Sequence, residues 1–237
     1  MASTDPPPAS PTLREARHVG PDRAFAWYSE AMRLFKRHPV GFALLALVVF
    51  VSELALAAIP FVGTSGAKIV VPLLACSLLY ATLAVDRGDR PRFAHLAAPF
   101  AAEPRAIGAV VGASLVVFAV EWLVGWQAGH VNLLVTSDMQ HVSGAAILAI
   151  YGSGVVVSLP LTLVPMLALF EGAGAREAFS ASAAAFSRNF TAFLLYGALS
   201  VALLGLAFVT AGLALVIVLP LWAASSFAAW KDLYSIA

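Results

Sequence analysis

The chain of 237 residues alternates between long apolar runs and short polar segments. The last run, Phe190 to Trp230, holds no charged residue, and its middle at Thr210-Ala211-Gly212 is the only part suited to a turn. A membrane-spanning helix needs about 20 apolar residues. The run therefore predicts two spanning helices joined as a hairpin.

The same pattern extends over the rest of the chain and predicts an all-α fold, a polytopic membrane helical bundle with amphipathic interfacial helices. Residues 1–21 are rich in proline and carry no apolar core, which predicts a disordered cytoplasmic tail. Residues 22–237 then form a single membrane domain. Its six predicted spans cover about residues 40–60, 68–85, 106–126, 145–170, 190–209 and 212–230.

Composition supports a lipid environment. The chain is 61% hydrophobic and 11% charged, with a mean hydropathy of +0.88, whereas a soluble domain is roughly 25% charged. The net charge of +1 does not point to nucleic acid. The one cysteine, Cys76, lies inside an apolar run, so no disulfide framework is expected, and a small buried side chain is favoured over a reactive thiol.

Three segments between the spans are amphipathic. The first precedes the first span and is predicted to lie flat on an anionic lipid surface, although a cytosolic helix packed on the bundle would show the same pattern. A second surface helix is expected within residues 86–105, and a third segment covers residues 172–189. In the first segment, the residues expected to contact the membrane surface are Phe25, Trp27, Tyr28, Arg33, Phe35, Lys36 and Arg37.

The distribution of basic residues predicts the orientation. With six spans both termini lie on one side, and of the 14 lysines and arginines all but Lys68 fall on that side. Basic residues concentrate in the cytoplasmic loops of membrane proteins. We therefore expect a multi-pass protein of the bacterial inner membrane with both termini in the cytoplasm.

An internal repeat is one interpretation of this order. Residues 24–44 align with residues 175–195, and each even-numbered span holds a Pro-Leu pair and ends near an acidic residue. The unit would be a surface helix, an outward span and a bent inward span, repeated in parallel; chance matches among Leu and Ala are the alternative. The proline bends could enclose a central cavity or be ordinary packing kinks. The residues concerned are Pro72, Pro160 and Pro220, with Asp86, Glu171 and Asp232.

Charged residues within the spans are the candidates for a transport site, because such charges are costly in hydrocarbon. Glu53, Lys68 and Glu121 all fall in the outer half of the predicted bundle. Lys68 could pair with either glutamate. A proton or cation site is the functional hypothesis, and snorkelling side chains or one structural ion pair is the alternative.

No catalytic or metal-binding constellation is found. His130, Asp138 and His141 share the outer loop, but their spacing fits no tight metal motif, so a polar loop is favoured. The chain has no Gly-rich phosphate loop, no HExxH and no GxSxG. We expect neither enzymatic activity nor a cofactor.

Four stretches carry a resemblance: RLFKRHPVGF, AVDRGDRPRF, AFSRNFTAFLLYG and AAWKDLYSIA. With them the chain resembles, over about residues 22–236, the uncharacterised six-span inner-membrane proteins of proteobacteria. Those are similar to the membrane domain associated with glycerophosphodiester phosphodiesterases. The resemblance implies no established activity and no catalytic residues. The use of Ala and of Arg over Lys agrees with a GC-rich bacterial genome.

Two hypotheses of function remain from the sequence. In the first, a protein without catalytic activity scaffolds or regulates a membrane process through lipids, other membrane proteins or copies of itself. In the second, the chain is a small transporter or channel subunit that uses the three charges of the outer half. A cavity lined by Glu53, Lys68 and the proline bends would favour transport. A tightly packed bundle with the charges facing outward would favour a scaffold.

Overall fold

The computed structural model describes residues 14–59, 63–129, 132–133 and 142–236. Within these residues every regular element is a helix, which confirms the all-α prediction. The α-helices are α1 (Arg23–Arg37), α2 (Pro39–Ala57), α3 (Gly63–Asp86), α4 (Pro104–Gly129), α5 (Gly144–Ser158), α6 (Val164–Leu169), α7 (Ala175–Arg188), α8 (Phe190–Val209) and α9 (Leu215–Leu233). Short 3-10 turns lie at η1 (Phe93–Leu96), η2 (Ala98–Ala101) and η4 (Leu159–Leu161).

In the described part of the chain, 6 helical segments are long and apolar enough to cross a membrane. They match the predicted spans in order and number, so the multi-pass membrane architecture is confirmed. Their bounds are Pro39–Ala57, Gly66–Asp86, Pro104–Ala128, Gly144–Leu161, Phe190–Val209 and Leu215–Leu233.

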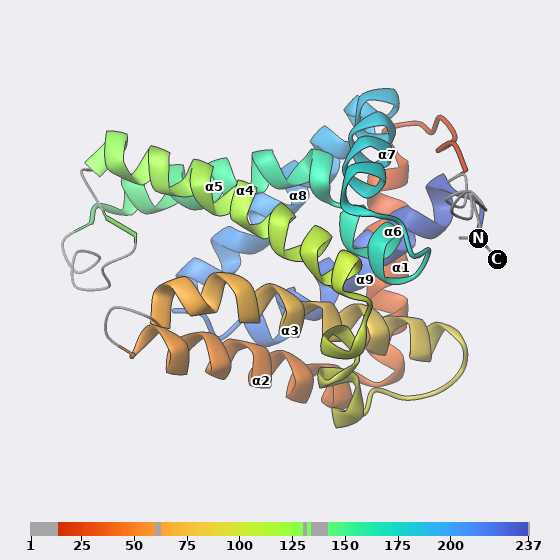
Figure 1. Ribbon diagram of the computed structural model, residues 1–237, viewed down its shortest axis with the longest axis horizontal. Coiled ribbons are helices and arrows are strands. Elements are labelled where there is room, and N and C mark those ends of the chain that lie inside the picture. The colour runs from red at the N-terminus through yellow and green to blue at the C-terminus, as the bar shows by residue number, and fades with distance from the viewer. Residues whose placement is uncertain (1–13, 60–62, 130–131, 134–141, 237) are drawn as a thin grey trace, which may run out of the picture.

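The spans are not equally buried. Figure 1 shows α2 beside α3 and α4 beside α5, with the two pairs diverging from the end where α1, α6 and α7 gather. Half of α9 is buried inside the protein (50%), against 17% of α4. α9 packs more extensively on α1, α2 and α3 than on α8. The predicted hairpin of α8 and α9 is therefore splayed, and α9 alone is the central helix.

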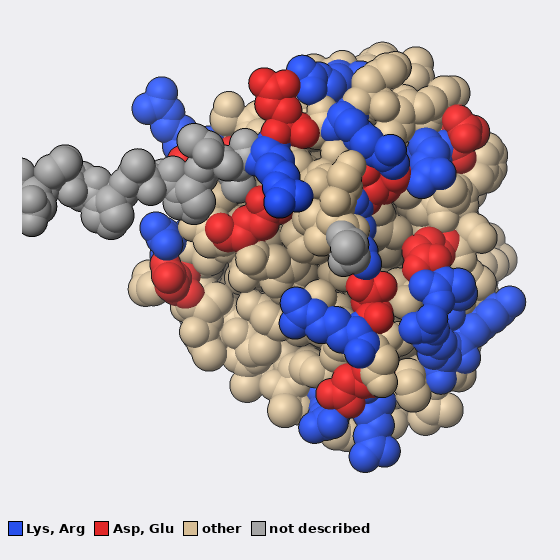
Figure 2. All heavy atoms as spheres, turned by 90° about the vertical axis from the view of Figure 1, so that its right-hand side faces the viewer, with Lys and Arg blue, Asp and Glu red and all other residues tan. Residues whose placement is uncertain are grey.

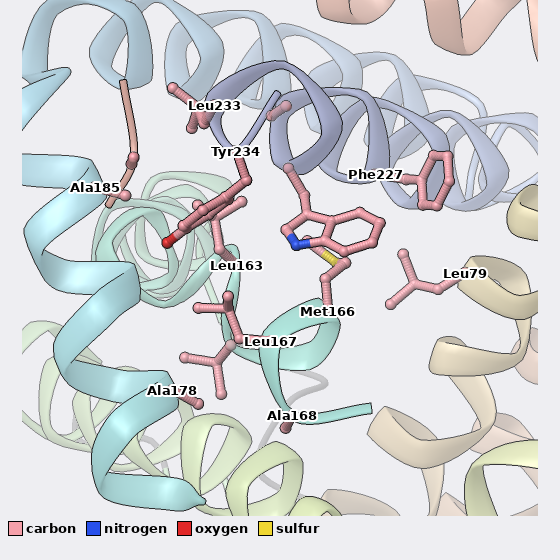
Figure 3. Packing of buried hydrophobic residues seen from close by; sticks show 14 of the residues in the cluster. Leu79, Leu163, Met166, Leu167, Ala168, Ala178, Ala185, Phe227, Leu233 and Tyr234 are labelled. Atoms are coloured by element: carbon pink, nitrogen blue, oxygen red, sulfur yellow. The ribbon is translucent and has the colours of Figure 1, made fainter. Parts of the chain in front are cut away.

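The core is densest at the end of the molecule that carries α6. Leu163, Met166 and Leu167 are fully buried there and belong to one apolar cluster with Phe227 and Tyr234 of the α9 end. Figure 3 shows these side chains converging between α6, α7 and α9. Close packing of this kind fixes the relative positions of the helices.

Two prolines break the predicted fourth span into pieces. α5 ends at Ser158, the chain forms η4 around Pro160, and α6 begins beside Pro165. Proline removes a backbone donor and clashes with the preceding turn. Ser182 of α7 satisfies the freed groups, because its Oγ donates to Pro160 O (2.7 Å) and accepts from Leu163 N (3.2 Å). The fourth predicted span, residues 145–170 with a bend at Pro160, is therefore two helices joined by a 3-10 turn rather than one bent helix.

The first and third units of the proposed repeat share a joint. His38 separates α1 from α2 with φ −143° and ψ 59°, and Asn189 separates α7 from α8 with φ −122° and ψ 33°. Each residue ends one helix and begins the next without an intervening loop. The second unit differs, since the expected surface helix in residues 86–105 is replaced by η1 and η2.

Residues 14–20 are ordered, so the prediction of disorder is wrong for them, while residues 1–13 lie outside the described chain. Arg17 N donates to Leu233 O (2.8 Å) and Val19 N donates to Asn189 Oδ1 (2.7 Å). Ala16 and Val19 are buried. These contacts, made with residues far along the chain, offset the ordering entropy that a short polar segment cannot offset alone.

Candidate functional site

A pocket of about 390 Å³ lies between five of the spans. Its walls come from α3, α4, the broken segment of α5 and η4, α8 and α9. Pro72 and Pro165 line it, whereas Pro160 and Pro220 do not. Of the three predicted proline bends, Pro72 therefore borders the pocket, and Pro160 and Pro220 belong to the packing around it. Of the described residues that line the pocket, none is charged.

Most of the pocket wall is apolar, and its hydroxyl groups are already engaged. Ser158 Oγ donates to Val155 O (2.7 Å), and Thr162 Oγ1 donates to Ser158 O (3.0 Å). Ser226 Oγ likewise donates to Ala223 O (3.0 Å). Such hydroxyls keep only lone pairs for an occupant. An ion would lose its hydration shell there without gaining a charged partner, which is costly.

The pocket lies within the hydrocarbon depth of the spans. Ser114 is ten residues from the start of α4, and Trp222 is eleven from the end of α9, which places both about 15 Å from the inner ends at 1.5 Å per residue. The hydrocarbon core of a bilayer is about 30 Å thick. The pocket is thus near the mid-depth of the bundle.

A polar cluster joins this pocket to α1. Tyr28 OH and Ser200 Oγ are 2.7 Å apart, and Tyr196 OH lies 3.2 Å from Ser225 Oγ. The rings of Tyr28 and Tyr196 stack with centroids 5.3 Å apart. Burial raises the pKa of Tyr28. Tyr28 therefore contacts the bundle through its hydroxyl, and a movement of α1 would displace a wall of the pocket.

The structure separates the three candidate transport residues from the pocket lining. Glu53 is exposed on α2. Lys68 Nζ lies 4.8 Å from the ring centroid of Phe118. Among the described residues no nitrogen–oxygen contact within 4.0 Å joins Lys68 to Glu53 or Glu121, so the suggested ion pair is not formed. Glu121 nevertheless lies within electrostatic reach of Lys68 and of Glu53.

Lys68 and Glu121 lie beyond the pocket lining at the end of the spans away from α1, which we call the mouth of the pocket. Lys68 is one helical turn outward from Pro72, which lines the pocket, and Glu121 is one turn outward from Val117, which also lines it. The Glu121 carboxyl lies against Gly154 of α5, where an added Cβ would be 2.9 Å from Glu121 Cδ. The absence of a side chain at Gly154 therefore makes room for this carboxyl.

The inner end of the bundle is held by three consecutive residues of α9. Trp230 Nε1 donates to Glu171 Oε1 (2.7 Å), and Lys231 Nζ donates to Asp86 Oδ2 (2.7 Å). Asp232 accepts from Arg17, from Arg23 Nε (2.9 Å) and from Trp27 Nε1 (2.8 Å). The acidic residues at the ends of the even-numbered spans, Asp86, Glu171 and Asp232, are thus all part of the polar contacts made around residues 230–232 of α9. Figure 2 shows Lys, Arg, Asp and Glu gathered on this face.

The residues predicted to contact the membrane surface divide into three groups. Phe25, Arg33, Lys36 and Arg37 are exposed. Tyr28 and Phe35 are half-buried. Trp27 is only 1% exposed, so its predicted contact with the membrane surface is wrong.

Helix α1 turns a different side to the bundle than its sequence pattern suggests. Its buried residues, Ala24, Trp27, Ala31 and Leu34, pack toward the rest of the protein. Phe25 remains 57% exposed beside the basic residues. The Arg33 side chain donates to Glu30 (Nε to Oε2, 2.7 Å), and this bond lowers the pKa of Glu30. The exposed side of α1 combines an aromatic ring with Arg33, Lys36 and Arg37.

No protein-family model, curated protein or solved structure matches the chain. The resemblance to the six-span inner-membrane family stays a prediction from the sequence. His130, Asp138 and His141 lie outside the described residues.

Proposed function

We propose that the protein is a non-catalytic membrane protein of the bacterial inner membrane, which scaffolds or regulates a membrane process through contacts with lipids or other membrane proteins. Its termini lie in the cytoplasm, where the basic residues of α1, α7 and the span ends meet the head groups. The observation that carries the proposal is the uncharged pocket at the mid-depth of the spans. A mainly apolar cavity in hydrocarbon suits a lipid chain and does not suit a hydrated solute.

The exposed side of α1 supports the same function. Phe25, Arg33, Lys36 and Arg37 are exposed on a helix that leads directly into the first span. Basic residues beside a spanning helix attract anionic lipids, and an aromatic ring adds apolar contact. Because α1 also contacts the pocket wall through Tyr28 and Ser200, lipid contact at the surface is coupled to the cavity.

Transport is the second candidate, and one observation favours it. Lys68 and Glu121 lie at the mouth of the pocket without an ion pair between them, and Glu121 is within electrostatic reach of Glu53. Unpaired charges in spans commonly mark ion or substrate paths. In this second function the pocket would be one part of a path that opens outward.

Two measurements on one preparation separate the candidates. The protein is purified in detergent, and co-purified lipid is extracted and counted per chain. The same protein is reconstituted into vesicles, and proton and cation flux is measured with and without Glu53→Gln. Retained lipid near one molecule per chain, with no flux above that of empty vesicles, is the expected result. Flux that falls in Glu53→Gln would replace the scaffold proposal with transport.

A further inference from the structure

The pocket and its charged mouth together have the dimensions of one half of a bilayer. Along α3, the eleven residues from Lys68 at the mouth to Leu79 in the lining span about 16 Å. Half of a hydrocarbon core is about 15 Å thick. A hydrocarbon chain that entered at Lys68 would therefore reach the mid-depth of the membrane inside the pocket.

The apolar lining of the pocket favours a hydrocarbon chain, and the charged side chains at its mouth favour a charged head group. Pocket residues such as Leu79, Val110 and Val155 offer only apolar surface. At the mouth, the Lys68 ammonium group lies over Phe118, and the Glu121 carboxyl lies against Gly154. These two groups have opposite sign, and no contact within 4.0 Å pairs them in the described chain. Each is therefore available to a ligand group of the opposite charge.

A ligand that matches this arrangement is an amphiphile with both signs in its head group. A phosphate would pair with Lys68, which acts as a compact cation. A primary ammonium group would pair with Glu121, because it carries N–H donors that a carboxylate accepts. A purely anionic head would meet Lys68 but also the carboxylates of Glu121 and Glu53. A quaternary ammonium group would lack the N–H donors.

We propose that the pocket binds one acyl chain of a zwitterionic phospholipid from the outer leaflet, with the phosphate at Lys68 and a primary ammonium group at Glu121. This inference rests on the proposed function, since it names the lipid class that the pocket holds. It adds a head-group preference, which a pocket that merely fills with surrounding lipid would not have.

The test uses the full chain in lipid nanodiscs or detergent, with native mass spectrometry to count retained lipids. Phosphatidylethanolamine, phosphatidylcholine and phosphatidylglycerol of the same acyl composition are supplied in equal amounts. We expect the first to be retained about tenfold more than the other two, a difference that each change of Lys68→Met or Glu121→Gln reduces to about twofold. Equal retention of the three lipids by the unchanged chain would overturn the head-group assignment.

Two substitutions place the lipid in the pocket. Ala223→Phe on α9 and Ala75→Phe on α3 fill it from two different helices, whereas Ala202→Phe adds the same ring on the exposed side of α8. Each variant must elute as a folded species. Either filling variant should lose the retained lipid, and Ala202→Phe should keep it. If both filling variants still retain the lipid, the pocket is not its binding site, although the proposed function through lipid contacts would still hold. If no form of the protein retains lipid, both the pocket assignment and the proposed function are rejected.

Discussion

Lys231 and Asp86 are 145 positions apart in the sequence, yet their Nζ and Oδ2 atoms lie 2.7 Å apart. The contact ties the inner end of the central helix α9 to the inner end of α3. On either side of Lys231, Trp230 binds Glu171 in the segment after α6, and Asp232 binds Trp27 of α1. The end of α9 thus fixes the inner end of the bundle, while the outer halves of the spans diverge.

Loss of the Asp232 carboxylate should destabilise the protein. Its side chain is 8% exposed, whereas Arg17 and Arg23 are 52% and 41% exposed and remain screened by solvent. For Asp232→Asn we expect the free energy of unfolding to fall by about 1–3 kcal/mol, measured by thermal unfolding in detergent. Asp89→Asn is the matched control, because Asp89 pairs with Arg92 on the surface and both are largely exposed. An equal change in the two variants would contradict the role of Asp232.

Ser182 should matter more than its small size suggests. Ser182→Ala removes the donor to Pro160 O and the acceptor for Leu163 N, leaving two buried backbone groups without these partners. We expect Ser182→Ala to lower the free energy of unfolding by about 1–3 kcal/mol. Ser187→Ala on the same helix is the control, since Ser187 is exposed and its Oγ bonds only to Ala183 O of its own turn. If both variants unfold at the wild-type temperature, the break in the fourth span is held by other contacts.

Gly154 should matter mainly for the position of the Glu121 carboxyl. In Gly154→Ala the new methyl group overlaps this carboxyl, which is the end of a flexible side chain and must move aside, so we expect the free energy of unfolding to fall by no more than about 1 kcal/mol. Gly152→Ala should be neutral or stabilising, because nothing lies within 4 Å of its added Cβ. Combining Gly154→Ala with Glu121→Ala should restore most of the loss. Additive effects in the double variant would show that the two residues do not touch.

Tyr234 should make the protein sensitive to alkaline pH. Burial, followed by the charge of Glu171, raises the pKa of Tyr234 to about 12 from its ordinary value of 10.0. A raised pKa in the folded state means that this contribution to stability is complete below pH 10. It is lost as the pH rises toward 12. Thermal unfolding between pH 9 and 12 should therefore decline less steeply in Tyr234→Phe than in the unchanged chain, and parallel curves would contradict the assignment.

The spans were predictable because each apolar run is local to the sequence. The start of α8 at Phe190 and its end at Val209 coincide with the predicted bounds. Of the three prolines expected to bend the spans, only Pro72 lines the pocket, so their pattern indicated a cavity only in part. What a local pattern could not supply is the partner of each polar group.

Three corrections share this cause. Trp27 looked like a surface aromatic because its partner Asp232 lies 205 positions away. Residues 14–20 looked disordered because Asn189, which orders Arg17 and Val19, is about as distant. The fourth span was expected only to bend at Pro160, because the serine that holds its broken ends is on another helix. Amphipathic periodicity indicates that a helix has a buried side. Contacts with residues distant in the sequence determine which side is buried.

The most direct test of the central claim, a six-span bundle with its basic end in the cytoplasm, is cysteine labelling in intact cells. Cys76 is replaced by alanine, and single cysteines are introduced at Ala58, exposed at the outer end of α2, or at Ser187, exposed on α7. A membrane-impermeant maleimide should label Ala58→Cys in intact cells and Ser187→Cys only after permeabilisation. Labelling of Ser187→Cys in intact cells, with Ala58→Cys protected, would contradict the account.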